Sequence, residues 1–259
     1  MTQIKRGESF NEIAQVYDLA RPGYPRKLID DIINRAHLSD EAKILDIGTG
    51  TGKGTVPFAD KGYAVHCIEP GENLIEVAKK NLSIYPQVTF EVTTFEDWNL
   101  QENSFDLAIS AQAFHWVNRE IGYPKVAQAL KDKGHIAFFW NFFTPADEIV
   151  FDVLKEAYKK YVPSTSDNPS ISSLIEKRKD WILNSNCFHN LVTKEYPWSI
   201  DFSAEEYLNL VKTQTIYQTF NTKQKQELSR DFIEIINNYG GTVTRQYLSV
   251  LFFAQKMAI

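Results

Sequence analysis

A run of alternating glycines followed by a lysine is the first place where residue types and spacing could do chemistry. The stretch ILDIGTGTGKGT, residues 44–55, carries four glycines directly after a short apolar run. Glycine lets the backbone adopt positive φ and lets a ligand approach without a Cβ in the way. Loops of this composition hold nucleotide-type ligands, so the spacing has to decide which ligand fits.

Two phosphate-binding loops do not fit this spacing. A P-loop reads Gly-x-x-x-x-Gly-Lys-Ser/Thr, and Gly52 with Lys53 would supply its Gly-Lys pair. The first glycine then falls at Ile47 and the hydroxyl residue at Gly54, which excludes a P-loop. A dinucleotide loop reads Gly-x-Gly-x-x-Gly, and its last glycine falls at Lys53 or at Thr55. A dehydrogenase would therefore need a degenerate loop.

A third pattern, Gly-x-Gly-x-Gly, is met by Gly48, Gly50 and Gly52, with Asp46 two residues before the first glycine. Glu69 ends the second expected strand, 21 residues after Gly48. An acid at that position can accept hydrogen bonds from both hydroxyls of a ribose, and its charge disfavours a 2′-phosphate. The pattern therefore favours a nucleoside ligand without a phosphate at this loop.

The loop resembles motif I of class I S-adenosylmethionine-dependent methyltransferases. Three other segments of the chain are similar to further segments of the same family. TTFEDW, after the third expected strand, is similar to the family segment that grips adenine. SFDLAISAQAFHW resembles motif IV and its trailing segment in small-molecule enzymes of the methyltransferase-11 type. FNEIAQVYDLARPGYP is similar to the entry segment of a subset that includes trans-aconitate methyltransferase-like enzymes. The resemblance covers residues 10–141 and hardly constrains residues 144–241.

The resemblance implies S-adenosyl-L-methionine as cofactor and assigns residues to it. The glycines would give clearance for its amino-acid tail, whose carboxylate is favoured by the helix N-terminus after the loop. Arg21 would lie near that carboxylate, and either Glu96 or Asp97 would be the acid beside the base. The implied cofactor-binding residues are Tyr17, Arg21, Asp46, Gly48, Thr49, Gly50, Gly52, Glu69, Pro70, Asn73, Leu74, Thr94, Phe95, Glu96, Ala111 and Gln112.

Candidates for the acceptor side follow the fourth and fifth expected strands. His115 could deprotonate a hydroxyl or orient an acid because histidine titrates near neutrality, or it could simply pack beside Trp116. Trp140 and Phe143 come after the fifth strand and suit an apolar or planar acceptor, although core packing explains the rings as well. A small-molecule acceptor methylated at oxygen or carbon, such as a carboxylate or a phenol, is the favoured hypothesis.

Composition narrows the possible partners. The 259 residues are 43% hydrophobic and 24% charged, as in a globular protein, and their net charge of −5 argues against a nucleic-acid partner. The two cysteines fit no metal-ligand spacing, and the N-terminus is too polar for a signal peptide. We expect a cytoplasmic protein without a metal or a membrane partner. The alternatives are a non-catalytic S-adenosylmethionine-binding module and a methyltransferase acting on protein or nucleic acid.

The elements that must position these residues alternate between strand and helix. Strands are expected at 43–48, 64–69, 88–94, 104–112 and 134–141, and helices between them at 53–62, 71–85 and 123–134. This alternation predicts an α/β fold with a mostly parallel, Rossmann-like sheet, whose ligands lie at the carboxyl ends of the strands.

The second half of the chain reads as mainly helical, at 146–162, 170–184, 203–220 and 221–241. A strongly β-rich segment, 242–256, then predicts an antiparallel strand that returns to the sheet. We expect a cofactor-binding core of residues 1–143 and 242–259 and a helical cap of residues 144–241. A segment at 191–200 is expected as a strand that could join the core. The alternative is two separate domains.

Overall fold

The computed structural model describes residues 10–144, 149–161 and 169–258. The chain forms two compact units, each assembled from segments that are distant in sequence. Unit 1 comprises Met1–Arg21, Phe143–Pro169 and Pro197–Leu248, and unit 2 comprises Pro22–Phe142, Ser170–Tyr196 and Ser249–Ile259. In the described ranges no helix is long and apolar enough to cross a membrane.

Unit 2 contains a sheet that begins with four short strands. Strand β1 (Lys43–Ile47) lies between β2 (Ala64–Glu69) and β4 (Phe105–Ala111), and β3 (Val88–Val92) lies beyond β2. All these pairs are parallel. Because helices cover both faces of a parallel sheet, such strands are apolar along most of their length, and in β1 every residue after the first is buried.

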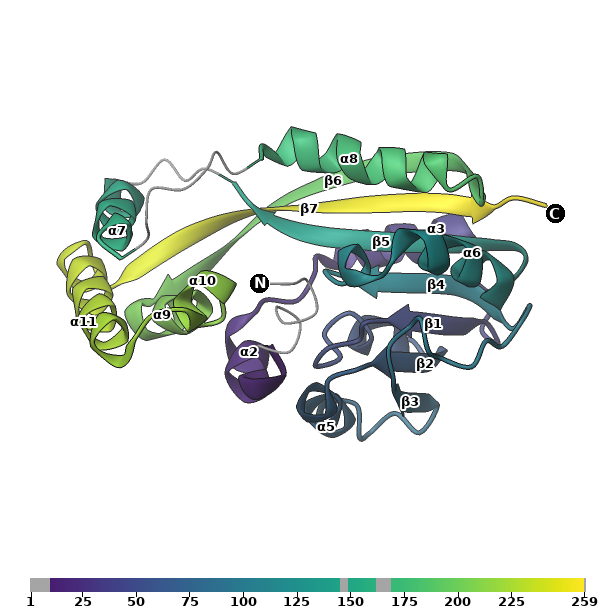
Figure 1. The fold of residues 1–259 in the computed structure, drawn as a ribbon, viewed down its shortest axis with the longest axis horizontal. Coiled ribbons are helices and arrows are strands. Elements are labelled where there is room, and N and C mark those ends of the chain that lie inside the picture. Colours follow the sequence, from purple (N-terminus) through teal and green to yellow (C-terminus); the bar gives the residue numbers. More distant parts are fainter. Residues whose placement is uncertain (1–9, 145–148, 162–168, 259) are drawn as a thin grey trace. The chain divides into compact units, whose positions relative to one another are not determined.

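Three long strands complete the seven-stranded order β3-β2-β1-β4-β5-β7-β6. Strand β5 (Leu130–Phe143) pairs in parallel with β4, whereas the arrow of β7 (Thr242–Lys256) points the opposite way (Figure 1). The sheet is thus mostly parallel with a late antiparallel strand, as predicted. Strand β6 (Phe188–Ser203) includes the segment 191–200, so that segment does join the sheet.

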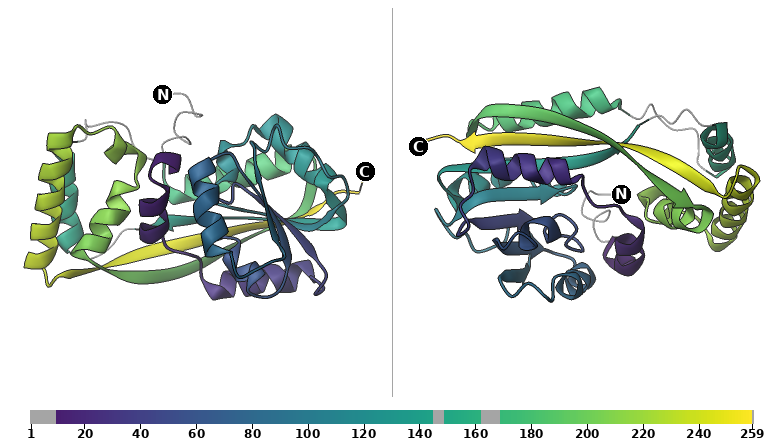
Figure 2. Two further views of the ribbon diagram at one scale, coloured as in Figure 1. Left: turned by 90° about the horizontal axis from the view of Figure 1, so that it is seen from below. Right: turned by 180° about the vertical axis from the view of Figure 1, so that it is seen from behind.

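The helices of unit 2 connect these strands. Helices α3 and α6 lie on opposite faces of the sheet (Figures 1 and 2). Beneath α3 the core brings together apolar residues of β1, β2, β4, β5 and β7, including Ile44, Leu107, Phe139 and Leu251. The bounds are α3 Arg26–Ala36, α4 Val56–Ala59, α5 Glu72–Asn81, the 3-10 turn η1 Phe114–Trp116, α6 Arg119–Ala129 and α8 Ile171–Asn184.

Unit 1 is mainly helical and has an aromatic-rich core of its own. Helix α11 packs against α7 and α9, and α9 also packs against α2 and α10. Their buried faces meet around Leu228, Phe232 and Tyr247. The bounds are α2 Ala14–Ala20, α7 Ile149–Lys159, α9 Ala204–Lys212, α10 Thr215–Gln218 and α11 Thr222–Asn238.

These units differ from the expected division into residues 1–143 with 242–259 and residues 144–241. Contacts group Met1–Arg21 with the helical unit and Ser170–Tyr196 with the sheet unit. The division into a cofactor-binding core and a cap concerns ligands and stays a prediction. Residues 146–148 and 162 of the expected helix 146–162 lie outside the described residues.

Several expected helices are wrong in extent. The helix expected at 203–220 is divided into α9 and α10. The helix expected at 53–62 is a single turn, α4, which ends well before Gly62. The helix expected to stop at Gly134 is α6, which ends at Ala129 because Leu130 is already extended. Gly134 instead lies within β5, where an added Cβ would meet the carbonyl oxygen of Lys131 at 2.9 Å. That glycine serves a tight backbone approach at a strand irregularity and does not cap a helix.

Candidate functional site

The loop after β1 folds back onto the end of β2. The amides of Gly48 and Thr49 both donate to the carbonyl of Ile68, at 2.8 and 3.2 Å. Gly48, Gly50 and Gly52 all have positive φ, at 73°, 59° and 88°. Each position thus has a backbone conformation that other residues adopt only with strain.

The surroundings of the three glycines separate structural from ligand-related roles. A Cβ on Gly48 would meet Cβ of Ala113 at 2.4 Å, and a Cβ on Gly52 would meet Cδ1 of Leu82 at 2.8 Å. A Cβ on Gly50 would meet nothing within 4 Å. Packing therefore requires glycine at position 48, and a Cβ at position 52 would displace the Leu82 side chain, whereas Gly50 borders open space that a ligand could occupy.

Asp46 lies beneath this loop and is fully buried. One carboxylate oxygen, Oδ2, accepts a 2.5 Å hydrogen bond from Oγ1 of Thr55, while Oδ1 has no hydrogen-bond partner among the described residues. Burial raises the pKa of Asp46 to about 6, against the effect of the bonded hydroxyl. An unpartnered carboxylate oxygen in this position favours a hydrogen-bond donor or a positive group next to the loop.

Glu69, at the end of β2, connects two loops through its carboxylate. Oε2 accepts from the Gly50 amide at 3.0 Å, and Oε1 accepts from the Gly71 amide at 2.9 Å. Each carboxylate oxygen can accept a second hydrogen bond, so both retain capacity for hydroxyl donors. Glu69 is 8% exposed, and burial raises its pKa despite the two amides. The carboxylate is held rigidly at the position that the sequence predicts for ribose recognition.

The neighbouring predicted residues lie along the same edge. Thr49 is buried and its hydroxyl faces the Asp46 carbonyl at 3.4 Å. Pro70 and Asn73 are exposed after β2, and Leu74 is buried on α5. Because β1 and β2 are parallel and end together, the structure brings these residues to one end of the sheet.

The segment after β3 is a compact turn. The Thr94 hydroxyl donates to Asp97 at 2.7 Å and accepts from the Asp97 amide at 3.1 Å. The ring of Phe95 is buried and stacks on Trp98. Glu96 accepts from the Asn118 amide, the N-cap of α6, at 2.7 Å. Both candidate acids thus have partners within the protein, and neither is singled out as the one beside a base.

Beyond β4, the chain turns sharply at Gln112, whose φ is 62°. Its amide donates to the Phe139 carbonyl at 2.9 Å, and its side chain donates to the Asn141 carbonyl at 3.1 Å. These bonds tie the loop after Ala111 to β5. The turn therefore sets the position of the next residues along the chain, including His115.

His115 is the predicted catalytic candidate, and its ring is held by Trp140. The indole Nε1–H of Trp140 donates to Nδ1 of His115 at 3.2 Å. Nδ1 is then an acceptor, so the proton of the neutral ring sits on Nε2. Burial, together with the charge of Arg178, lowers the pKa of His115 to about 4. The imidazole is therefore neutral near pH 7 and a weak base.

The predicted acceptor-side aromatics fall into both units. Trp116 is half-buried beside His115, with ring centroids 4.6 Å apart. Trp140 is buried in unit 2, whereas Phe143 belongs to unit 1, where it packs on Tyr247. Of the residues predicted to line an acceptor pocket, Trp116 and Trp140 are thus brought together around His115.

Tyr17 and Arg21, predicted to lie on one face of a helix, do so in unit 1. The guanidinium carbon of Arg21 lies 5.5 Å from the Tyr17 ring centroid. Arg21 also donates to the hydroxyl of Thr213 at 2.8 Å and to its carbonyl at 3.3 Å. These bonds anchor Arg21 to the end of α9, and its role toward a carboxylate stays a prediction.

Arg178, on α8, lies beside the predicted residues His115 and Trp140 and was missed by sequence reasoning. Its guanidinium carbon lies 4.5 Å from the ring centroid of Trp140. One signal could have found it: the buried stripe of α8 reads Ile175, Arg178, Ile182, so a charged residue occupies an apolar position.

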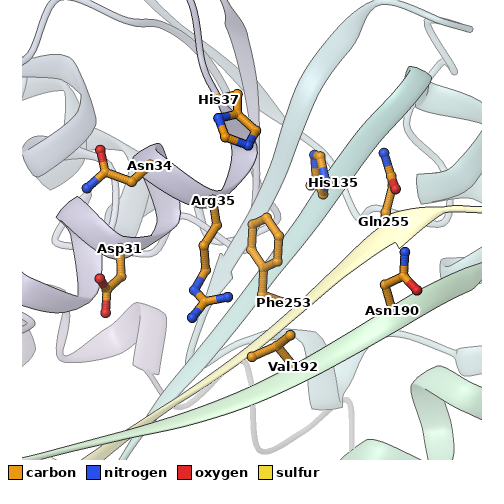
Figure 3. A pocket seen from close by; sticks show the side chains of 9 residues that line it. All are labelled: Asp31, Asn34, Arg35, His37, His135, Asn190, Val192, Phe253 and Gln255. Carbon is orange, nitrogen blue, oxygen red and sulfur yellow. The ribbon is translucent and has the colours of Figure 1, made fainter.

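A separate pocket of about 480 Å³ has other lining residues, whose side chains are drawn in Figure 3. Its lining includes Arg35, His37 and His135, and none of the predicted site residues. His135 pairs with Leu107, near the beginning of β4, so the pocket lies toward the amino ends of the parallel strands. Ligands of open α/β sheets bind at the other end, which separates this pocket from the candidate site.

Comparison with known proteins adds a sequence match in the same region. Residues 45–138 match the family model described as "Methyltransferase domain". An uncharacterized methyltransferase of Mycobacterium tuberculosis is 33% identical over 133 residues, which cover 51% of this chain and 52% of the relative. A Saccharomyces cerevisiae protein named as a probable S-adenosylmethionine-dependent methyltransferase is 30% identical, over 56% of this chain and 50% of the relative. The chain spans about half the length of these curated relatives.

Solved structures share the fold. A protein of Anaeromyxobacter dehalogenans, assigned as a type II methyltransferase, aligns with a TM-score of 0.64 at 21% identity, covering 91% of this chain and 96% of the other. A phosphoethanolamine N-methyltransferase of Haemonchus contortus aligns with a TM-score of 0.57 at 14% identity, covering 99% and 59%. At these identities the likeness concerns the class I, Rossmann-like fold alone.

Proposed function

We propose that this chain is an S-adenosylmethionine-dependent methyltransferase acting on a small-molecule acceptor, a proposal supported by the match of residues 45–138 to the family model described as "Methyltransferase domain". The observation that carries the proposal is the Glu69 carboxylate. It is fixed by the amides of Gly50 and Gly71 at the end of β2, and both oxygens keep the capacity to accept from ribose hydroxyls.

The residues around Glu69 fit the rest of this cofactor. The open space at Gly50 gives room for its amino-acid tail, and the unpartnered Oδ1 of buried Asp46 lies under the same loop. A negative oxygen there suits the positive charge of an amino group or a sulfonium. When bound, the cofactor supplies an activated methyl group on sulfur. The protein residues bind and orient it.

The acceptor side favours positioning over proton transfer. A base with a pKa of about 4 is poorly matched to operation at neutral pH, so His115 is better suited to fix the acceptor than to deprotonate it. An acceptor atom that is already ionised needs only orientation and exclusion of water. We therefore assign His115 and Trp140 to the wall of the acceptor site.

Calorimetry with S-adenosylhomocysteine tests the cofactor assignment. We expect the wild type to bind and Glu69→Ala to bind more weakly by about 1–3 kcal/mol, because ribose hydroxyls and two loop amides lose their acceptor. Glu91→Ala is the control, since Glu91 is a half-buried acid on the neighbouring strand that pairs with His66. Unchanged affinity in Glu69→Ala would refute its role, and no binding by the wild type would refute the proposed cofactor.

Transfer from labelled S-adenosylmethionine separates the remaining alternatives. A panel of carboxylic acids, phenols and quinones, a protein extract and a nucleic-acid sample would be offered in parallel. Methyl transfer to a small molecule supports the proposal. Transfer only to protein or nucleic acid, or cofactor binding without transfer to any of them, would replace it with an alternative acceptor class or a binding module.

A further inference from the structure

Arg178 is a buried cation in the layer between α8 and the sheet of unit 2. Arg178 is 8% exposed. The guanidinium carbon lies 4.5 Å from the Trp140 ring centroid and 5.3 Å from that of Phe142. Two aromatic rings thus contact the guanidinium, whose five N–H donors lie in its plane.

No carboxylate balances this charge in the part of the chain that the structure describes. The one hydrogen bond from the guanidinium goes from Nη1 to the Leu174 carbonyl of the same helix, at 3.0 Å. Nε is buried and has no hydrogen-bond partner. The nearby groups are the rings of Trp140, Phe142 and Tyr123 and the neutral His115. Burial lowers the pKa of Arg178 to about 10, so the side chain still carries its charge near pH 7.

An unpaired buried charge is costly, and an isolated cation of this kind is normally matched by an anion. Apolar residues would fill the same position on α8 without that cost, as Ile175 and Ile182 do one turn away. Packing alone therefore does not account for an arginine with an unused donor. A ligand that brings a negative charge would.

The position of Arg178 says which ligand. Trp140 and Phe142 stand near the carboxyl end of β5, and Trp140 also holds His115 in the loop after β4. The carboxyl ends of the strands are where ligands of open α/β sheets bind. We propose that Arg178 binds an anionic group of the methyl acceptor, a carboxylate or a phosphate, and so selects acidic acceptors. This inference rests on the proposed methyl transfer, because it names the acceptor class of the same site.

Three probes that share a phenyl ring test the proposal: benzoate, phenyl phosphate and neutral benzamide. Each would be titrated into the full chain with and without saturating S-adenosylhomocysteine, with the Arg178 Nε–H signal followed by ¹⁵N NMR. We expect at least one anion to bind about tenfold or more tightly than benzamide and to shift that signal. Which anion binds separates a carboxylate-bearing from a phosphate-bearing acceptor.

Substitutions make the result specific. In Arg178→Met the preference for the anion should disappear, and in Arg178→Lys part of it should remain because the charge is kept. Arg119→Met is the matched control, since the exposed Arg119 also covers a tryptophan, Trp181, at 4.6 Å. That variant should bind all probes as the wild type does. Circular dichroism would confirm that each variant is folded.

The outcomes separate the two proposals. Equal binding of benzoate, phenyl phosphate and benzamide, or a preference that survives in folded Arg178→Met, overturns the role of Arg178. Should Arg178→Met not fold, an Nε–H signal of the wild type that neither anion moves overturns it equally. Failure of S-adenosylhomocysteine to bind would instead overturn the proposed function, and the titrations without it would still report on Arg178.

Discussion

His115 illustrates how its surroundings change what a residue can do. In the sequence, a histidine after the fourth strand suggests a base that titrates near neutrality. In the structure, the Trp140 indole donates to Nδ1, and burial beside Arg178 disfavours the charged ring. Neither effect is visible in the sequence, because Trp140 and Arg178 come from elements 25 and 63 residues further along the chain.

The lowered pKa of His115 makes the folded chain less stable at acidic pH. In the unfolded chain His115 takes up a proton near pH 6.5, whereas in the folded chain it does so only near pH 4. Its contribution to the free energy of unfolding is thus present above pH 6.5 and is lost as the pH falls toward 4. We expect the imidazole signal of His115, assigned with His115→Gln, to stay constant from pH 8 to about 5.5. A midpoint near 6.5 would contradict this environment.

Glu69 and Arg178 mark how far single residues could be predicted. The place of Glu69 beside the glycine loop could be predicted because strand length and loop length fix its distance from the glycines, and both are local properties. Arg178 was missed because its meaning depends on Trp140 and Phe142, which reach it only through the packing of α8 on the sheet. Spacing along the chain contains information about local distances, but not about contacts that form only when distant elements pack together.

At the scale of elements, the sequence predicts that all three glycines of the loop give clearance for the ligand. The surroundings of the three glycines differ, because a Cβ would clash with Ala113 at position 48 and would displace the Leu82 side chain at position 52. Of these three glycines, Gly50 alone borders open space. A pattern of alternating glycines therefore combines two requirements, the packing of the loop itself and the approach of a ligand.

This division predicts different outcomes for two alanine substitutions. Gly48→Ala adds a clash with Ala113 to the backbone strain, so we expect a large loss of stability. Gly50→Ala adds only strain, about 1–2 kcal/mol, but should weaken S-adenosylhomocysteine binding by about tenfold because its Cβ enters the ligand space. Gly62→Ala, at another positive-φ glycine with open surroundings, is the control and should leave binding unchanged. Thermal unfolding measures the loss of stability, and calorimetry measures the loss of S-adenosylhomocysteine affinity. Normal binding by Gly50→Ala would contradict the ligand role of Gly50.

The boundary between α6 and β5 shows why element limits were harder to predict than element types. The segment 123–134 has apolar residues at helical spacing, and a glycine at its end normally indicates a helix stop. The chain leaves the helix five residues earlier because β5 begins at Leu130, which pairs with Phe105 of β4 ahead of a register shift. Pairing with a distant strand overrides the local preference, and no window of the sequence contains that partner.

At the level of the whole chain, the mostly parallel sheet with its late antiparallel strand β7 was predicted correctly, whereas the way contacts group the segments into two units was not predicted. Strands β6 and β7 each begin in one unit and end in the other. Sequence reasoning cuts a chain between elements, so it has no means to place a boundary inside a strand. Each unit nevertheless has a hydrophobic core of its own.

Separate cores predict that a cavity in one unit acts first on that unit. Leu228 is fully buried in the core of unit 1, and Leu107 is fully buried in that of unit 2. We expect Leu228→Ala to cost about 2–5 kcal/mol and to speed amide hydrogen exchange in α9 and α11 more than in β1 and β4. Leu107→Ala should show the reverse order. Equal acceleration of all four elements in both variants would mean that the cores do not act separately.

The two buried carboxylates beneath the glycine loop bear on turnover. Burial raises the pKa of Glu69, and the neighbouring charge of Asp46 adds to that rise, so the loop concentrates negative potential in a poorly solvated place. A sulfonium that enters this place relieves the repulsion, whereas the neutral thioether left after methyl transfer does not. Under the proposed function, the electrostatics that favour the charged methyl donor would therefore weaken binding of the neutral product. Because the charges are buried, salt would screen this difference little, and the loop that binds the cofactor would also favour release of the product.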